Sequence, residues 1–319
     1  MKLILVLTML SNIAIASSLK IATLVPKGTN WADTLTQMNK EIKSETNGEV
    51  KLKIYYGGTQ GDEPDVLRKI RIGQLHGGIF TGKILGDIYP DIRSLEIPFN
   101  FYDNEEKALA AIAMQTNYFN QKISEKGFVN LGFYGIGKVY VVSRKKVTSI
   151  DEMKGIKMWS WEGDHLSEAM MQSLGLVSVP LALTDVTSSL STGMIDAAYA
   201  PPLAIIGLQW HSKVKYIIDF PTAYSVGALL ISKKDWSKIS ATNQEKVKTI
   251  SKRNIDKANE LAKIDNKNSL DVLKKSGVEF ISFNKSDIEK AETIRAGVIK
   301  KLKGKLLSAE IIKVIEKLR

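Results

Sequence analysis

The stretch from Lys154 to Asp164 reads K-G-I-K-M-W-S-W-E-G-D, and the fold is best interpreted outward from it. Gly155 closes a short helix, and the residues from Ile156 to Trp161 are predicted to form a strand. Side chains alternate between the two faces of a strand, so Trp159 and Trp161 should point the same way. Two neighbouring indoles followed by charged residues either fill a core or line a cleft. We expect the cleft.

The composition is that of a folded globular protein. The chain has 319 residues, of which 44% are hydrophobic and 25% charged, and this length allows two domains with well-filled cores. Residues 1–18 combine Lys2 with an apolar run and Ala14-Ile15-Ala16, which predicts a secretory signal peptide (residues 1–16) cleaved after Ala16. A buried N-terminal strand is the alternative. No later run approaches the ~20 apolar residues that cross a bilayer.

The charge and the cysteine content narrow the function classes. The absence of cysteine excludes a lipid-anchored Cys and disulfides, so we expect an exported protein that is free in a bacterial periplasm. The net charge is +11, with lysine densest at Lys300, Lys301, Lys303 and Lys305. Arginines and aromatics do not interleave on one element, which argues against nucleic acid. The basic surface either faces anionic lipid headgroups or an acidic membrane partner, or is a solvated lysine-rich helix face.

Hydrophobic periodicity predicts an α/β protein. Strands at Leu19 to Val25, Val50 to Tyr56 and Gly78 to Phe80 alternate with predicted helices, which is typical of a mixed or parallel sheet flanked by helices. Two later strands, Phe128 to Phe133 and Val139 to Ser143, are joined through glycines, and the second is long enough to cross between domains. Residues 241–275 contain no Gly or Pro and predict an unusually long helix.

Several motifs together resemble one known family. They are Ile97-Pro98-Phe99-Asn100-Phe101, the segment Ser149 to Lys157, Met194-Ile195-Asp196 with Pro201 and Pro202, and Leu230 to Trp236. On these residues the chain resembles the DctP-type solute-binding receptors of tripartite ATP-independent periplasmic (TRAP) transporters. The likeness extends over nearly all of the chain after the predicted signal.

The resemblance implies a two-domain α/β periplasmic binding protein of the Venus-flytrap kind, with mixed sheets, crossing strands and a long helix spanning both domains. We expect an N-terminal lobe of residues 19–140 plus 226–255 and a C-terminal lobe of residues 141–225 plus 256–319, sharing the helix at about 241–275. The family binds a small-molecule solute between the lobes and docks on TRAP membrane permease subunits driven by an ion gradient. For this chain we expect no cofactor and assign no metal-binding residues, and the sequence leaves open whether a metal ion assists ligand binding.

Two departures from the family pattern bear on the ligand. Family members that bind carboxylates carry an arginine at the position of Trp159 and tend to carry an asparagine at the position of Ala200, and a third basic position matches Lys138. A planar guanidinium–carboxylate pair cannot be imitated by indole. We therefore predict a hydrophobic or aromatic solute that is not a dicarboxylate. The expected ligand-binding residues are Trp159, Trp161, Tyr199, Ala200, Lys138, Trp31, Thr81 and Phe80.

Two alternative functions stay open. An organic acid could be held in a rearranged clamp by Lys138, Lys157 or Arg144. A ligand-sensing subunit could report to a membrane signalling partner. Catalysis is disfavoured, because the three histidines (His76, His165 and His211) form no metal-binding motif and no G-x-S-x-G nucleophile occurs. Each tryptophan could also belong to a core, since an apolar helix or strand residue is usually buried.

Overall fold

A computed structural model describes residues 17–318 of the chain. The predicted signal peptide of residues 1–16 therefore lies outside the described residues. The strands are β1 (Ser17–Thr23), β2 (Val50–Tyr55), β3 (Gly77–Thr81), β4 (Phe128–Ser143), β5 (Lys157–Ser160), β6 (Val177–Pro180), β7 (Ala197–Ala200), β8 (Tyr216–Ser232) and β9 (Glu279–Ile281). The α-helices are α1 (Asn30–Glu45), α2 (Glu63–Arg71), α3 (Gly82–Ile88), α4 (Glu105–Glu125), α5 (His165–Ser173), α6 (Val186–Thr192), α7 (Pro202–Gly207), α8 (Lys233–Trp236), α9 (Ala241–Lys275), α10 (Lys285–Leu302) and α11 (Ala309–Leu318). Short 3-10 helices are η1 (Pro90–Glu96), η2 (Asp151–Met153), η3 (Leu183–Asp185) and η4 (Trp210–Ser212).

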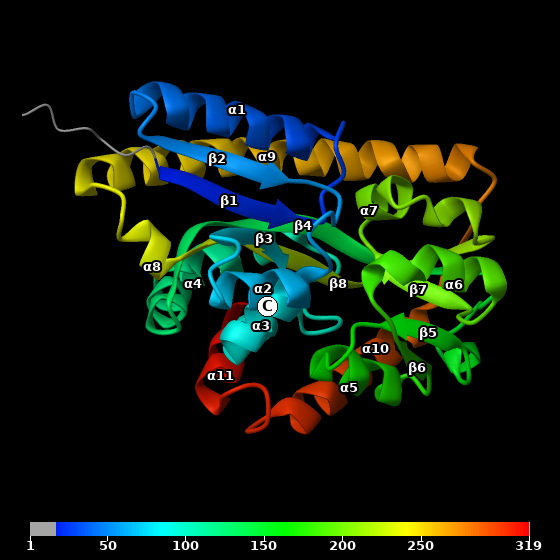
Figure 1. Cartoon of the computed structure of the whole chain (residues 1–319). Coiled ribbons are helices and arrows are strands. Elements are labelled where there is room, and N and C mark those ends of the chain that lie inside the picture. Colours follow the sequence, from blue (N-terminus) through cyan, green and yellow to red (C-terminus); the bar gives the residue numbers. More distant parts are fainter. Residues whose placement is uncertain (1–16, 319) are drawn as a thin grey trace, which may run out of the picture.

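The strands form one mixed sheet that serves two lobes. Its order is β2-β1-β3-β8-β4-β7-β5-β6, with β9 beside β8. The two central strands, β4 and β8, pair antiparallel from Phe128↔Ser232 to Ser143↔Tyr216 and so pass through both lobes. We call β1–β3 with α1–α4 and η1 the first lobe, and β5–β7 with α5–α7 the second lobe (Figure 1). The predicted α/β two-domain fold with crossing strands is confirmed.

The crossing strand is continuous where the sequence predicted two strands. Gly135 and Gly137 lie inside β4, at a shift in its pairing with β8, instead of ending it. Gly137 has a φ of 135°, and a Cβ there would stand 2.5 Å from Nδ2 of Asn266. The glycines therefore bend one strand, as a β-bulge does, and let the backbone approach a neighbouring helix.

That helix is α9, which spans residues 241–275 as predicted and packs against α1, β4 and α7 (Figure 1). Asn259 Oδ1 accepts a hydrogen bond from the Gly135 amide, and Asn266 Nδ2 donates to the Ile136 carbonyl. Asn266 Oδ1 also accepts from the Leu203 amide at the start of α7. One face of α9 thus holds both the bend in β4 and the second lobe.

Three buried clusters fill the two lobes. One, with Met38 and Val247, lies between the sheet and the pair α1 and α9. A second, with Phe80 and Phe119, covers the opposite face of the first lobe and continues toward α5 and α10. The third surrounds Trp210 in the second lobe. The predicted lobe boundaries stay a prediction; α11, assigned by that prediction to the C-terminal lobe, contacts α4 and η1.

Within residues 17–318, no helix is both long and apolar enough to span a bilayer.

Candidate functional site

A cavity of about 170 Å³ lies between the two lobes. The first lobe contributes the end of β3, the start of α3 and η1, and the second lobe contributes β5, the start of α5, β7 and α7. Residues 222–225 of the crossing strand β8 also line it. In an open α/β sheet, strand ends that meet across two lobes are the usual position of a ligand. The cavity is therefore the candidate binding site.

Aromatic rings form the wall that belongs to the second lobe. The ring centroid of Trp159 lies 5.3 Å from that of Trp161, 5.1 Å from that of Tyr199 and 5.6 Å from that of Trp210. Trp159 is only 2% exposed, and its Nε1 donates to the Leu181 carbonyl at 3.0 Å. Trp159 thus belongs to the core of the lobe as well as to the cavity wall, whereas Trp161 is less deeply buried and is the more accessible indole.

Five of the eight residues predicted to bind ligand line the cavity; they are Trp159, Trp161, Tyr199, Ala200 and Thr81. The other three do not. Trp31 is 8% exposed and packs edge-on against Tyr134, with 4.6 Å between ring centroids. Phe80 is fully buried in the first lobe, because it points to the sheet face opposite to that of its neighbour Thr81.

The predicted basic positions do not reach the cavity either. Lys138 Nζ donates to the Asp103 carbonyl at 3.0 Å and is not part of the wall. Lys157 and Arg144 are exposed and also absent from the wall. By strand alternation Lys157 shares the face of Trp159, but it is the first residue of β5 and lies outside the wall. A clamp built from these three cations is therefore not assembled.

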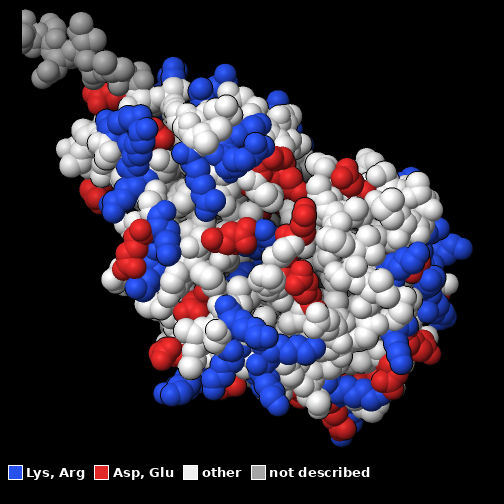
Figure 2. Space-filling view, turned by 60° about the horizontal axis from the view of Figure 1, so that its bottom comes forward, with Lys and Arg blue, Asp and Glu red and all other residues white. Residues whose placement is uncertain are grey.

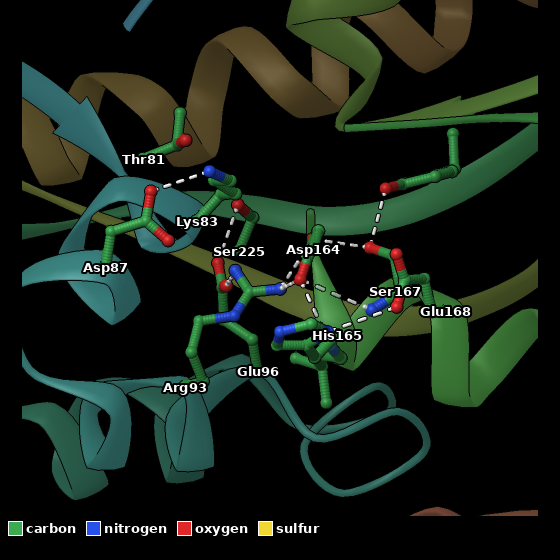
Figure 3. A network of polar contacts seen from close by, with 12 residues as sticks. Thr81, Lys83, Asp87, Arg93, Glu96, Asp164, His165, Ser167, Glu168 and Ser225 are labelled. Atoms are coloured by element: carbon green, nitrogen blue, oxygen red, sulfur yellow. Dashed lines mark hydrogen bonds and ion pairs between the residues drawn. The ribbon is translucent and has the colours of Figure 1, made fainter. Parts of the chain in front are cut away.

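The cation that does lie in the wall is Arg93, on η1. Its side chain sits between two carboxylates: Nη1 is bonded to Glu96 on the same 3-10 helix, and Nη2 donates to both oxygens of Asp164, at 2.8 and 2.9 Å (Figure 3). All three residues are at least 90% buried. Asp164 begins α5, so the Arg93–Asp164 pair joins the two lobes. A second bond between the lobes runs from the Leu183 amide to Asp62 Oδ2, at 3.0 Å.

Burial and the opposing charges shift the pKa values of Arg93 and Glu96. Burial disfavours the charge of Arg93, but Asp164 and Glu96 outweigh burial and raise the pKa of the guanidinium. Burial raises the pKa of Glu96, although Arg93 and the Val226 amide oppose it. Lys83, the other cation in the wall, is paired with Asp87 at 2.6 Å. Both cations of the wall are therefore already neutralised by the chain's own carboxylates.

Hydroxyl groups surround the same network, and their protons are already in use. Ser225 Oγ donates to Glu96 at 3.0 Å, and Tyr224 Oη donates to Glu105 at 3.0 Å. Ser167 Oγ donates to Asp164 at 2.6 Å, so Tyr199 is the donor in the 2.8 Å contact between Tyr199 and Ser167. A hydroxyl has one proton and two lone pairs. These hydroxyls therefore offer acceptors to the cavity.

Sequence reasoning missed Arg93, Glu96 and Asp164 as site residues. Arg93 and Asp164 are 71 positions apart, and no motif links them. One signal was present: Arg93 and Glu96 stand three residues apart and alternate with the apolar residues Ile92, Leu95 and Ile97 just before Pro98. A charged pair inside an apolar segment is rarely buried without a further partner. That rule indicates a polar site near residue 93 but cannot name Asp164.

Comparisons with known proteins agree on one family. The family model described as bacterial extracellular solute-binding protein, family 7, matches residues 21–305. An uncharacterised protein of Haemophilus influenzae is 28% identical over 76% of this chain and 73% of its own length. The C4-dicarboxylate-binding periplasmic protein DctP of Rhodobacter capsulatus is 23% identical over 73% of this chain and 70% of its own.

Solved structures share the fold. The sugar acid binding protein of Advenella mimigardefordensis, in complex with galactonate, superimposes with a TM-score of 0.89 at 17% identity, covering 95% of this chain and 97% of that one. A TRAP periplasmic solute-binding protein of Xanthobacter autotrophicus with bound β-D-galacturonate gives 0.87 at 19% identity, covering 94% and 98%. At these identities the likeness establishes the fold of the chain.

Proposed function

The chain belongs to family 7 of the bacterial extracellular solute-binding proteins, the receptors of TRAP transporters, and on that premise we propose that its solute is a compact, hydroxylated molecule of sugar type. The receptor captures this solute between its lobes and delivers it to a TRAP membrane permease. A carboxylate on the solute is not the anchoring group. Export to the periplasm, as for other members of the family, is part of this proposal.

The observation that carries the proposal is the direction of the hydrogen bonds around the cavity. Ser167, Tyr224 and Ser225 each donate their proton to a carboxylate of the chain, and Tyr199 donates to Ser167. What these four hydroxyls keep for a ligand is a set of lone pairs, which need donors. Sugar hydroxyls supply donors, whereas an ionised carboxylate only accepts. A polyol is therefore complementary to these four hydroxyls, and an ionised carboxylate is not.

The aromatic wall fits the same solute. A sugar ring has faces of C–H groups, and flat aromatic surface packs against such faces while the ring hydroxyls point to polar partners. Trp161 and Tyr199 supply that surface beside the hydroxyl of Ser167. A cavity of about 170 Å³ suits a compact solute.

The sequence-based prediction of a hydrophobic or aromatic solute is corrected. Similar structures hold galactonate and β-D-galacturonate, which are hydroxylated sugar acids. The prediction was wrong because the sequence pattern indicated the indoles but gave no indication that Arg93, Glu96 and Asp164 bring buried charge to the same cavity. Indoles in this setting pack against a polar ring instead of enclosing an apolar one.

A second candidate is a sugar acid, as in the structures just named, with its carboxylate on Lys83 or Arg93. On Arg93 this candidate requires Asp164 to give up its ion pair, and on Lys83 it requires the ammonium to hold a second carboxylate beside Asp87. The neutral solute requires no such rearrangement, and we favour it for that reason. The sensing role and the contact of the basic surface with a membrane stay predictions.

Matched pairs of solutes test the proposal. Thermal unfolding of the protein would be followed with galactose against galacturonate, glucose against glucuronate, and galactitol against galactonate. Each pair shares one carbon skeleton and differs in the carboxylate. We expect a neutral member to raise the melting temperature more than its acid, because a ligand that binds the native state stabilises it. Stabilisation by the acids alone would refute the neutral-solute proposal and favour the second candidate.

A further inference from the structure

We propose that Asp164 is a specificity-determining residue that excludes anionic solutes, because it occupies the position on Arg93 that a ligand carboxylate would need. The inference rests on the proposed function, and it names the carboxylate of Asp164 as the group that keeps a solute carboxylate from binding.

The geometry of the pair is that of a bound carboxylate. Nη2 of Arg93 donates to both oxygens of Asp164, at 2.8 and 2.9 Å, in a charge-assisted ion pair that occupies this edge of the guanidinium. Asp164 reaches Arg93 from the opposite lobe, just as a solute in the cleft would (Figure 3). The chain therefore carries its own carboxylate in the position of a ligand's.

The charge balance of the buried network disfavours binding of a further anion. One guanidinium faces two carboxylates, Glu96 and Asp164, so the buried network carries no surplus positive charge. A third carboxylate would face like charges at short range in a site that excludes water. Acidic side chains also gather along the middle of the face in Figure 2, between patches of Lys and Arg.

Asp164 is also held independently of Arg93, so a solute cannot easily displace it. It caps α5, where Oδ1 accepts from the Leu166 and Ser167 amides at 3.2 and 3.4 Å, and Oδ2 accepts from Ser167 Oγ at 2.6 Å. The N-terminus of a helix stabilises a negative charge at this position. Asp164 is thus held beside Arg93 by contacts that do not involve the guanidinium.

Removal of the charge alone should open the site to acids. Asn is as good a helix N-cap as Asp, so Asp164→Asn keeps the start of α5 while freeing one edge of the Arg93 guanidinium. Charge-assisted hydrogen bonds of this kind correspond to about 10- to 100-fold in affinity. Asp164→Asn should therefore bind galacturonate about 10- to 100-fold more tightly than the unmodified protein does.

The experiment is calorimetric titration of galacturonate into the unmodified protein, Asp164→Asn and a control. The matched control is Asp151→Asn, which removes one exposed carboxylate at η2, outside the cavity wall, and should leave galacturonate binding as it was. Asp164→Ser, which also retains a capping oxygen, replaces Asp164→Asn if the latter does not fold.

The outcomes separate the two claims. A gain of galacturonate binding in the Asp164 variant and not in the control supports the exclusion by Asp164. A folded Asp164 variant without that gain overturns the inference and leaves the neutral-solute proposal standing. Tight binding of galacturonate, and not of galactose, to the unmodified protein overturns the proposed function itself.

Discussion

Glu63 should make the stability of the protein fall as the pH rises through the neutral range. It is the first residue of α2 and is only 3% exposed. One carboxyl oxygen accepts from the Thr81 amide at 2.9 Å and the other lies 2.8 Å from the Thr81 hydroxyl. Burial, reinforced by the nearby charges of Asp62 and Glu96, raises the pKa of Glu63 from 4.5 to about 8.

The raised pKa of Glu63 fixes the sign and the size of the change in the free energy of unfolding with pH. Between pH 4.5 and about 8 the native state keeps a proton on Glu63 that the unfolded chain releases, so the free energy of unfolding decreases as pH rises. Each pKa unit corresponds to 1.36 kcal/mol, so the contribution lost by pH 8 is on the order of 4 kcal/mol. Glu63→Gln mimics the protonated carboxyl and should abolish this loss.

The assay is urea-induced unfolding of the unmodified protein and Glu63→Gln at pH 5 and at pH 8. The two proteins should be nearly equal at pH 5, and Glu63→Gln should be more stable at pH 8 by on the order of 4 kcal/mol. The control is Glu260→Gln, an exposed carboxylate on α9, which should show no such difference. Equal pH dependence in the unmodified protein and Glu63→Gln would refute the reasoning.

Two further predictions concern the cavity wall and the bend. Trp161→Ala should weaken binding of the neutral solute about tenfold with little change in stability. Trp159→Ala should cost about 3–5 kcal/mol of stability, because that ring is also part of the core. Calorimetry measures the first effect and urea unfolding the second, and identical behaviour of the two variants would contradict the assignment of Trp159 to the core and Trp161 to the accessible wall. Asn266→Ala should lower the free energy of unfolding by about 1–3 kcal/mol, because it leaves the Ile136 carbonyl and the Leu203 amide without their hydrogen-bond partner. Amide hydrogen exchange at Leu203 should become faster, and unchanged exchange there would argue against α9 holding the second lobe.

Periodicity predicted the elements whose signals are local. The helix at about residues 241–275 was predicted with the bounds that the structure has, because no Gly or Pro interrupts its apolar period. The strand carrying Trp159 was placed correctly as well, although it ends at Ser160 and not at Trp161. Alternation along that strand also placed its indoles in the cavity wall.

The rest depended on contacts between distant segments. Gly135 and Gly137 are ordinary strand-breaking signals, and only pairing with β8 and the asparagines of α9 keeps β4 continuous through them. Trp31 and Phe80 were assigned to the cleft from their position at element ends, but burial against their own lobe decided their orientation. Arg93 and Asp164 belong to different lobes, so their ion pair depends on how the two lobes pack and not on a local sequence signal.

The identity of the solute held by the protein is the most direct test of the account. Mass spectrometry of small molecules released on denaturing the exported protein would provide it. A neutral, hydroxylated compound of sugar size is the predicted result, because the cleft offers acceptors and its cations are already paired. Release of a uronic acid, an aldonic acid or a dicarboxylate would contradict the account.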